Sequence, residues 1–137
     1  MNQMFPAFAL TVLLLLCACA TPPQRSVTPI SGTISFTGEY IKLVQADVKP
    51  QARSMKPPVY PRHWRERGIE GVAVIAFIVD SEGVPTQVQC RSATDQAFAD
   101  AAQEAVRQWR FSPAHKNGRV MACAMEVPVR FTINRDG

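Results

Sequence analysis

The sequence predicts a small α+β domain over residues 57–137, in which one long helix packs on one face of a three-stranded antiparallel sheet. Three patterns predict it. An uninterrupted apolar run at residues 72–79 is typical of a central strand, and apolar residues at helical spacing from Phe98 to Trp109 indicate the helix. Alternating apolar residues at 120–133 indicate a strand with one buried face. The expected element order is αββαβ.

A short helix and a two-stranded hairpin open this domain. Residues 61–67 place a proline in the first turn of the short helix, and Gly68 follows its end. Gly71 then begins the apolar run, which should be covered on both faces because it contains no polar position. Residues 80–83 (Asp-Ser-Glu-Gly) predict a tight turn, and residues 84–91 alternate as a strand with one solvated face does.

The long helix and the last strand determine the order of the sheet. Residues 92–95 (Ser-Ala-Thr-Asp) offer N-caps for the helix, and the alanines in its middle let it approach the sheet closely. Because the helix reverses the chain, the last strand can pair antiparallel only with the first, which gives the order 2-1-3. The fully apolar first strand fits the central place, and the last strand is left as a long edge.

The beginning of the chain resembles a bacterial export signal. Residues 7–18 are apolar and uncharged, but shorter than the roughly 20 residues of a membrane-spanning helix. The run ends in Leu16-Cys17-Ala18-Cys19, which resembles a lipobox, and by that resemblance residues 1–18 are a signal peptide and Cys19 carries a lipid. A cut after Ala18-Cys19-Ala20, giving a soluble secreted protein, and an uncleaved anchor are the alternatives.

Residues 19–56 are interpreted as a linker, within which residues 33–44 alternate enough to form a short hairpin. Residues 25–67 carry eight Lys and Arg against three Asp and Glu, whereas residues 68–137 carry seven against eight. A basic leading segment could lie on anionic lipid or cell-wall polymer, although a solvated linker is the simpler interpretation. The positive charge is scattered and has no accompanying stacking aromatics, which argues against a nucleic-acid partner.

No pattern of catalytic or ligating residues is present in the sequence. His63 and His115 have no Cys, Asp or Glu partner at metal spacing, and neither a nucleophile elbow nor a phosphate-binding loop occurs. We therefore expect no enzyme, no metal and no cofactor. Cys90 and Cys123 are an even pair for an oxidising compartment, which favours a disulfide, but the expected topology places them at opposite ends of the sheet. Two buried thiols are the alternative.

Several short motifs lie where the predicted topology needs them. A glycine precedes the apolar strand, Asp-x-x-Gly follows it, and Val-Pro-Val-Arg-Phe lies in the last strand. With these motifs, residues 57–137 resemble the TonB C-terminal domain family and its TonB/TolA C-terminal-like fold. The residues that carry the resemblance most clearly are Tyr60, Pro61, Trp109, Arg110, Phe111 and Pro113.

The resemblance implies a periplasmic binding module for energy-coupled transport across the outer membrane. In this family an extended peptide of an outer-membrane transporter pairs with the edge of the last strand, a mode called β-augmentation. Pro128 has no N–H to offer at that edge, so we expect the pairing to concentrate nearer the start of the strand. The expected contact residues are Ala122, Cys123, Ala124, Met125 and Glu126.

Departures from the family pattern keep a second hypothesis open. The apolar run is short, the linker is short, and residues 57–61 (Pro-Pro-Val-Tyr-Pro) lack the Gln of the family's Gln-Pro-x-Tyr-Pro motif. The chain could instead be a lipid-anchored structural or interaction protein without motor coupling, its last strand covered by residues 33–44 or by a second copy in a homodimer. The expected partners are an outer-membrane transporter or another envelope protein. Ala20 after the lipidated cysteine favours the outer membrane.

Overall fold

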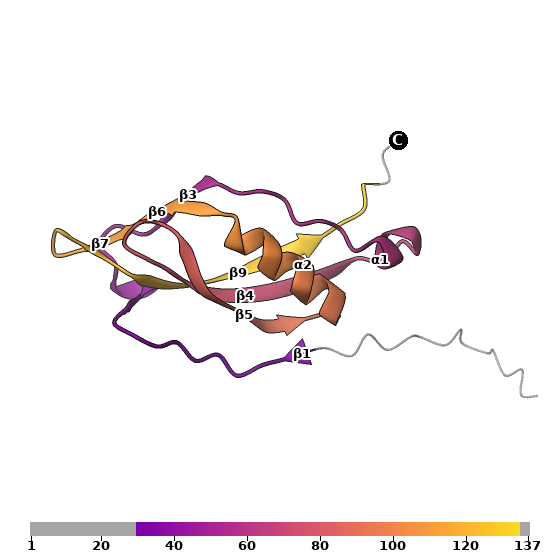
Figure 1. Cartoon of the computed structure of the whole chain (residues 1–137), viewed down its shortest axis with the longest axis horizontal. Helices are drawn as coiled ribbons and strands as arrows, with labels where there is room; N and C mark the ends of the chain where they lie inside the picture. The colour runs from indigo at the N-terminus through magenta and orange to yellow at the C-terminus, as the bar shows by residue number, and fades with distance from the viewer. Residues whose placement is uncertain (1–29, 135–137) are drawn as a thin grey trace, which may run out of the picture.

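The computed structural model describes residues 30–134, shown in Figure 1. The predicted signal peptide and the lipidation site at Cys19 lie outside these residues. No helix among residues 30–134 is long and apolar enough to cross a membrane. The strands are β1 (Ile30–Ser31), β2 (Ile41–Lys42), β3 (Gln51–Ser54), β4 (Gly71–Val79), β5 (Pro85–Ala93), β6 (Arg110–Ser112), β7 (Ala114–Lys116), β8 (Arg119–Met121) and β9 (Cys123–Phe131). The helices are η1 (Leu43–Gln45, a 3-10 turn), α1 (Arg62–Glu66) and α2 (Gln96–Arg107).

The main sheet has five strands in the order β1-β5-β4-β9-β2. Its centre, β5-β4-β9, is antiparallel throughout and has the order that the sequence predicts. The prediction of only three strands is wrong, because the leading segment adds a two-residue strand to each edge. β1 pairs antiparallel with β5, whereas β2 pairs parallel with β9, so the sheet is mixed.

The helix and the last strand are both shorter than predicted. α2 begins after Asp95, whose side chain accepts a hydrogen bond from the N–H of Ala97, and it ends at Arg107. It stops there because the next residues form β6, which pairs with β3. The expected strand at 120–133 is divided: its first residues form β8, which pairs with β7, and β9 begins only at Cys123.

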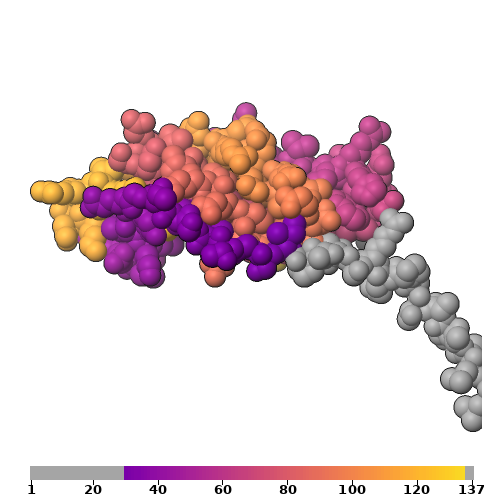
Figure 2. All heavy atoms as spheres, turned by 60° about the horizontal axis from the view of Figure 1, so that its bottom comes forward, coloured from indigo at the N-terminus to yellow at the C-terminus, as the bar shows by residue number. Residues whose placement is uncertain are grey.

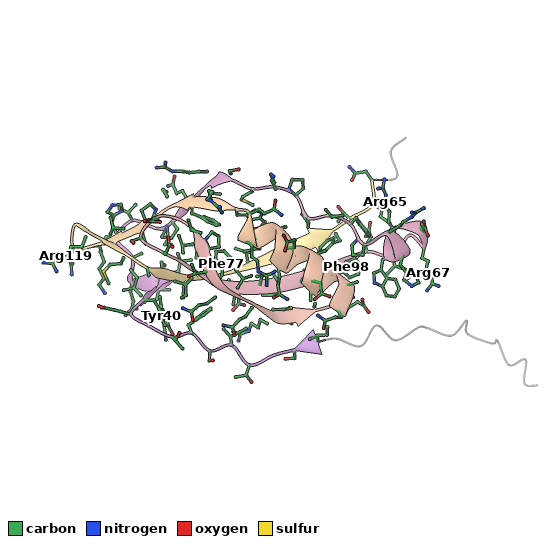
Figure 3. All side chains as sticks on the ribbon, viewed as in Figure 1. Tyr40, Arg65, Arg67, Phe77, Phe98 and Arg119 are labelled. Atoms are coloured by element: carbon green, nitrogen blue, oxygen red, sulfur yellow. The ribbon has the colours of Figure 1, made fainter. Side chains whose placement is uncertain are left out.

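The main core lies between α2 and one face of the sheet. Phe98, Ala102 and Val106 of the helix are buried against the face of β4 that carries Ile75 and Phe77. Figure 3 shows Phe98 between α2 and the strands. Gly71 is needed because a Cβ at this position would overlap the ring of Phe98.

The leading segment runs from β1 at one edge of the sheet to β2 at the other, over the face of Ala76, and Figure 2 shows it in indigo along one side of the domain. We call residues 32–40 the strap. No strand forms within the strap, so the expected hairpin over residues 33–44 is not seen, and the segment from residue 30 onward is part of the fold instead of a free linker.

The strap is held by two side chains of β5. The amides of Gln89 and Gln87 donate to the carbonyls of Ser35 (2.7 Å) and Thr37 (2.9 Å) and accept from the N–H groups of the same residues (3.4 and 2.8 Å).

The turn between β4 and β5 is tied to β6 through Gly83. Asp80 Oδ1 accepts hydrogen bonds from the N–H groups of Glu82 and Val84, each at 2.9 Å, which fixes the turn. Gly83 has a φ of 83°, and its carbonyl accepts from the N–H of Phe111 at 2.9 Å. A Cβ on Gly83 would overlap the carbonyl of Phe111.

Substitution of this glycine is therefore expected to be costly. Gly83→Ala should lower the free energy of unfolding by at least about 2 kcal/mol, because it adds a backbone overlap to the strain of a positive φ. Gly118→Ala is the matched control: its φ is 73°, but no atom lies within 4 Å of the added Cβ. The control should lose only about 1 kcal/mol. Urea unfolding followed by circular dichroism measures both, and equal losses would show that the contact with Phe111 is unimportant.

Candidate functional site

The first motif, Tyr60-Pro61, joins α1 to the core. The hydroxyl of Tyr60 donates to the carbonyl of Ile69 at 2.6 Å, and its ring meets those of Phe98 and Phe131 edge-on, with centroids 5.9 and 5.7 Å apart. Pro61 lies at the N-terminal end of α1, where its carbonyl accepts from the N–H groups of residues 64 and 65. These residues thus fix the start of the domain.

Trp64 of α1 is half-buried. Its indole N–H donates to Asp95 Oδ1 at 3.0 Å, and its ring stacks on Phe98 with centroids 6.3 Å apart. The same carboxylate oxygen accepts the N-cap bond of α2, so the indole finds an acceptor at the helix end. Sequence spacing alone does not show this contact, because α1 and α2 are far apart in the chain.

The second motif, Trp109 to Pro113, holds the leading segment against the core. Trp109 and Phe111 are buried, and the Trp109 indole N–H donates to the carbonyl of Lys56 at 2.8 Å. Arg110 is exposed, and its guanidinium donates to the carbonyls of Arg107 and Trp109 just beyond α2. Pro113 lies half-buried between β6 and β7. Both motifs therefore have structural roles away from the predicted binding edge.

The predicted binding edge, Ala122 to Glu126, is already paired over part of its length. Ile41 lies opposite Cys123 and Lys42 opposite Ala124 in a parallel ladder. The N–H of Ile41 donates to the carbonyl of Ala122 at 2.9 Å. The first half of the edge is thus occupied by β2, as the second hypothesis expects of the leading segment, although only two residues take part. The only local sequence signal for this strand is the apolar Ile41 beside the polar Lys42.

The rest of the outer edge of β9 has no strand beside it within the described residues. In an antiparallel ladder alternate residues bond to the same neighbour. Pro128 lies opposite Val74 and has no N–H, so Glu126, Pro128 and Arg130 turn their main-chain groups away from β4. This stretch therefore offers outward N–H groups only at Glu126 and Arg130. Charged side chains and a proline are the features that commonly protect a free edge.

A hollow of about 590 Å³ adjoins this edge on the face away from α2. Its lining includes Ile34, Phe36 and Tyr40 of the strap region together with Ala76 of β4 and Glu126 of β9. The rings of Phe36 and Tyr40 meet edge-on at 5.7 Å, and Figure 3 shows Tyr40 well away from α2.

Across β4, the guanidinium of Arg91 pairs with the carboxylate of Glu126 at 3.0 Å. About half of each side chain is exposed, so this ion pair adds at most about 1 kcal/mol to stability. Its carboxylate lies beside the open edge, where it places a negative charge next to an incoming strand.

The two cysteines of the described part of the chain are free thiols. Cys90 lies opposite Ile75 and Cys123 opposite Val79, so they are four residues apart along β4 and on opposite sides of it. Burial raises the pKa of both thiols, which favours their protonated, less reactive form. Residues 30–134 contain no group of three His, Cys, Asp or Glu side chains that could hold a metal ion.

Comparison with known proteins identifies similar sequences and similar solved structures. The sequence profile of the family "Gram-negative bacterial TonB protein C-terminal" matches residues 56–133. The chain is 32% identical over 119 residues to Protein TonB of Vibrio cholerae, a match covering 82% of this chain and 46% of that protein. It is 36% identical over 81 residues to Protein TonB of Pseudomonas aeruginosa, covering 58% and 23%. The chain thus spans less than half the length of these curated relatives.

The fold is similar to the solution NMR structure of the Pseudomonas aeruginosa TonB CTD. The TM-score is 0.53 at 27% sequence identity, and the match covers 73% of this chain and all of that one. The likeness supports the α+β arrangement of α2 on the central strands.

Tyr60 can be followed by its ionisation. Burial, and to a smaller extent the negative charge of Glu70, raises the pKa of Tyr60 above its usual 10.0. In a Tyr40→Phe variant Tyr60 is the only tyrosine, because the chain has two. The near-ultraviolet absorbance of tyrosinate should then titrate at a higher pH in the folded variant than in urea. Stability from this group is complete below the unfolded pKa and is lost as pH rises through the folded pKa. A folded midpoint at or below the unfolded one would contradict the described packing of Tyr60.

Proposed function

The chain belongs to the family of Gram-negative bacterial TonB protein C-terminal domains, and from this we propose that it is a periplasmic binding module for energy-coupled transport across the outer membrane. In this proposal an extended peptide of an outer-membrane transporter adds to the outer edge of β9. One observation supports it most: this edge accepts a short parallel strand, β2, from elsewhere in the chain. A strand from a partner can use the same main-chain groups.

The proposal places the peptide along residues 122–126. The carbonyl of Ala122 and the main-chain groups of Ala124 and Glu126 point outward there, whereas Pro128 interrupts the edge further along. Each main-chain hydrogen bond contributes about 0.5–1.5 kcal/mol net. A short strand therefore binds weakly unless its side chains also fit into pockets. The hollow beside Tyr40 and Glu126 offers such space. In the same proposal a lipid on Cys19 holds the domain at a membrane.

The pairing of β2 with β9 also favours a second function. If β2 stays on β9 permanently, the chain is an envelope structural or interaction protein that has no free peptide site at Ala122–Glu126. Homodimer formation through the remaining edge belongs to this alternative.

Peptide titration distinguishes the two functions. Isotope-labelled protein is titrated with synthetic peptides from the N-terminal segments of the host's outer-membrane transporters, and its amide resonances are followed by NMR. Binding should shift the amides of residues 122–126 in a saturable way. The matched control is each peptide N-methylated at alternate residues, which removes main-chain donors and should abolish binding. Absence of saturable shifts, with the amides of β9 protected from exchange in the free protein, would favour the structural alternative.

A further inference from the structure

The strand β2 is attached to β9 through one buried side chain. Ile41 is 7% exposed and lies in a small apolar cluster with Ala114 and Cys123, which is separate from the main core. We call this place the Ile41 seat. The ladder with β9 ends at Lys42, whose side chain is exposed, and Val44 beyond it is 87% exposed. The N–H of Lys42 is bound by the side chain of Gln45 at 2.8 Å, so β2 presents no open donor there.

The loop that carries β2 is fixed at both of its ends. On one side the side-chain amide of Gln87 holds the main chain of Thr37. On the other side Asp47 is held by the β7–β8 hairpin, since its N–H donates to the carbonyl of His115 and its carboxylate accepts from the N–H of Asn117. Residues 38–46 can therefore leave β9 without detaching the rest of the leading segment.

Between Thr37 and Asp47 the loop contains a glycine that can act as a hinge, and open space lies beside it. Gly38 has a φ of 90°, and no atom lies within 4 Å of a Cβ placed there. The hollow of about 590 Å³ lies beside the loop, where Tyr40 lines it. The few main-chain bonds of a two-residue strand are opposed by the entropy of ordering the whole loop. Such segments open locally while the core stays folded.

We propose that β2 (Ile41–Lys42) is a built-in occupant of the peptide edge of β9, and that the partner is an extended peptide that displaces it. This inference rests on the proposed function. The partner runs parallel to β9, as β2 does, and places an aliphatic side chain in the Ile41 seat. The open stretch from Glu126 to Arg130 is the poorer alternative, because Pro128 removes a donor and the two flanking side chains are charged.

The test uses the full-length chain in detergent micelles and a peptide of its own sequence. The probe is residues 39–45 (Glu-Tyr-Ile-Lys-Leu-Val-Gln), and the control peptide has Asp in place of Ile. Ile41→Asp puts a charge in the apolar seat and should expel β2, whereas Val44→Asp changes an exposed residue of the same loop. The probe should bind the Ile41→Asp variant at least ~10-fold more tightly than the wild type or Val44→Asp, since the competing strand is gone. Its binding should shift the amides of Ala122–Glu126, and the control peptide should not bind.

Hydrogen exchange on the unaltered chain gives an independent measurement. The amide of Ile41 should exchange at least ~100-fold faster than that of Ile75 in β4, because β2 opens without unfolding the core. Equal protection of the two amides would overturn the inference, and so would failure of the probe to bind a folded Ile41→Asp variant. This measurement also decides the matter if the Ile41→Asp variant does not fold.

Failure of the proposed function would give a different result from failure of this inference. Transporter peptides would then bind neither the wild type nor Ile41→Asp, while the chain's own peptide would still bind the variant. Conversely, transporter peptides that bind the wild type only at residues 126–130 would overturn the displacement of β2 and leave the proposed function standing.

Discussion

The fold depends on β4 being covered at both edges and on both faces over most of its length. This strand has no polar side chain, so it needs hydrogen-bonding neighbours on both edges and apolar cover on both faces. β5 and β9 supply the edges, and α2 covers the face that carries Ile75 and Phe77. Ala76 and Ile78 point to the other face and are nevertheless only 2% and 4% exposed. The leading segment crosses that face, so cover for the second side of β4 comes from outside the αββαβ unit.

This arrangement links the leading segment to the edges of the sheet. A segment that crosses from β5 to β9 reaches both outer strands, and it adds β1 to one and β2 to the other. Further along, β3 pairs with β6, and Lys56 accepts a hydrogen bond from Trp109. The family motif around Trp109 thus stabilises the path of a segment that precedes it by more than fifty residues.

The central elements could be predicted from the sequence because their signals are local. The unbroken apolar run of β4, the helical spacing from Phe98 and the cap at Asp95 each lie within one element. The orientation of Pro128 could also be predicted, since a residue without N–H must face away from β4. The strap could not, because the side-chain amides of Gln87 and Gln89 take the place of a strand ladder there. A two-residue strand such as β2 is too short to show the alternation of apolar and polar residues that predicts a strand. The sequence therefore indicates the occupied edge only as a second hypothesis.

The folded leading segment also limits how far the domain can travel. With residues 30–56 folded against the sheet, a lipid on Cys19 would be joined to the domain by only residues 20–29. Ten residues reach at most about 35 Å when fully extended. A lipid-anchored form would therefore work as a short-tethered receptor, confined to a thin layer above the membrane that holds it. Its peptide partner would have to reach into that layer.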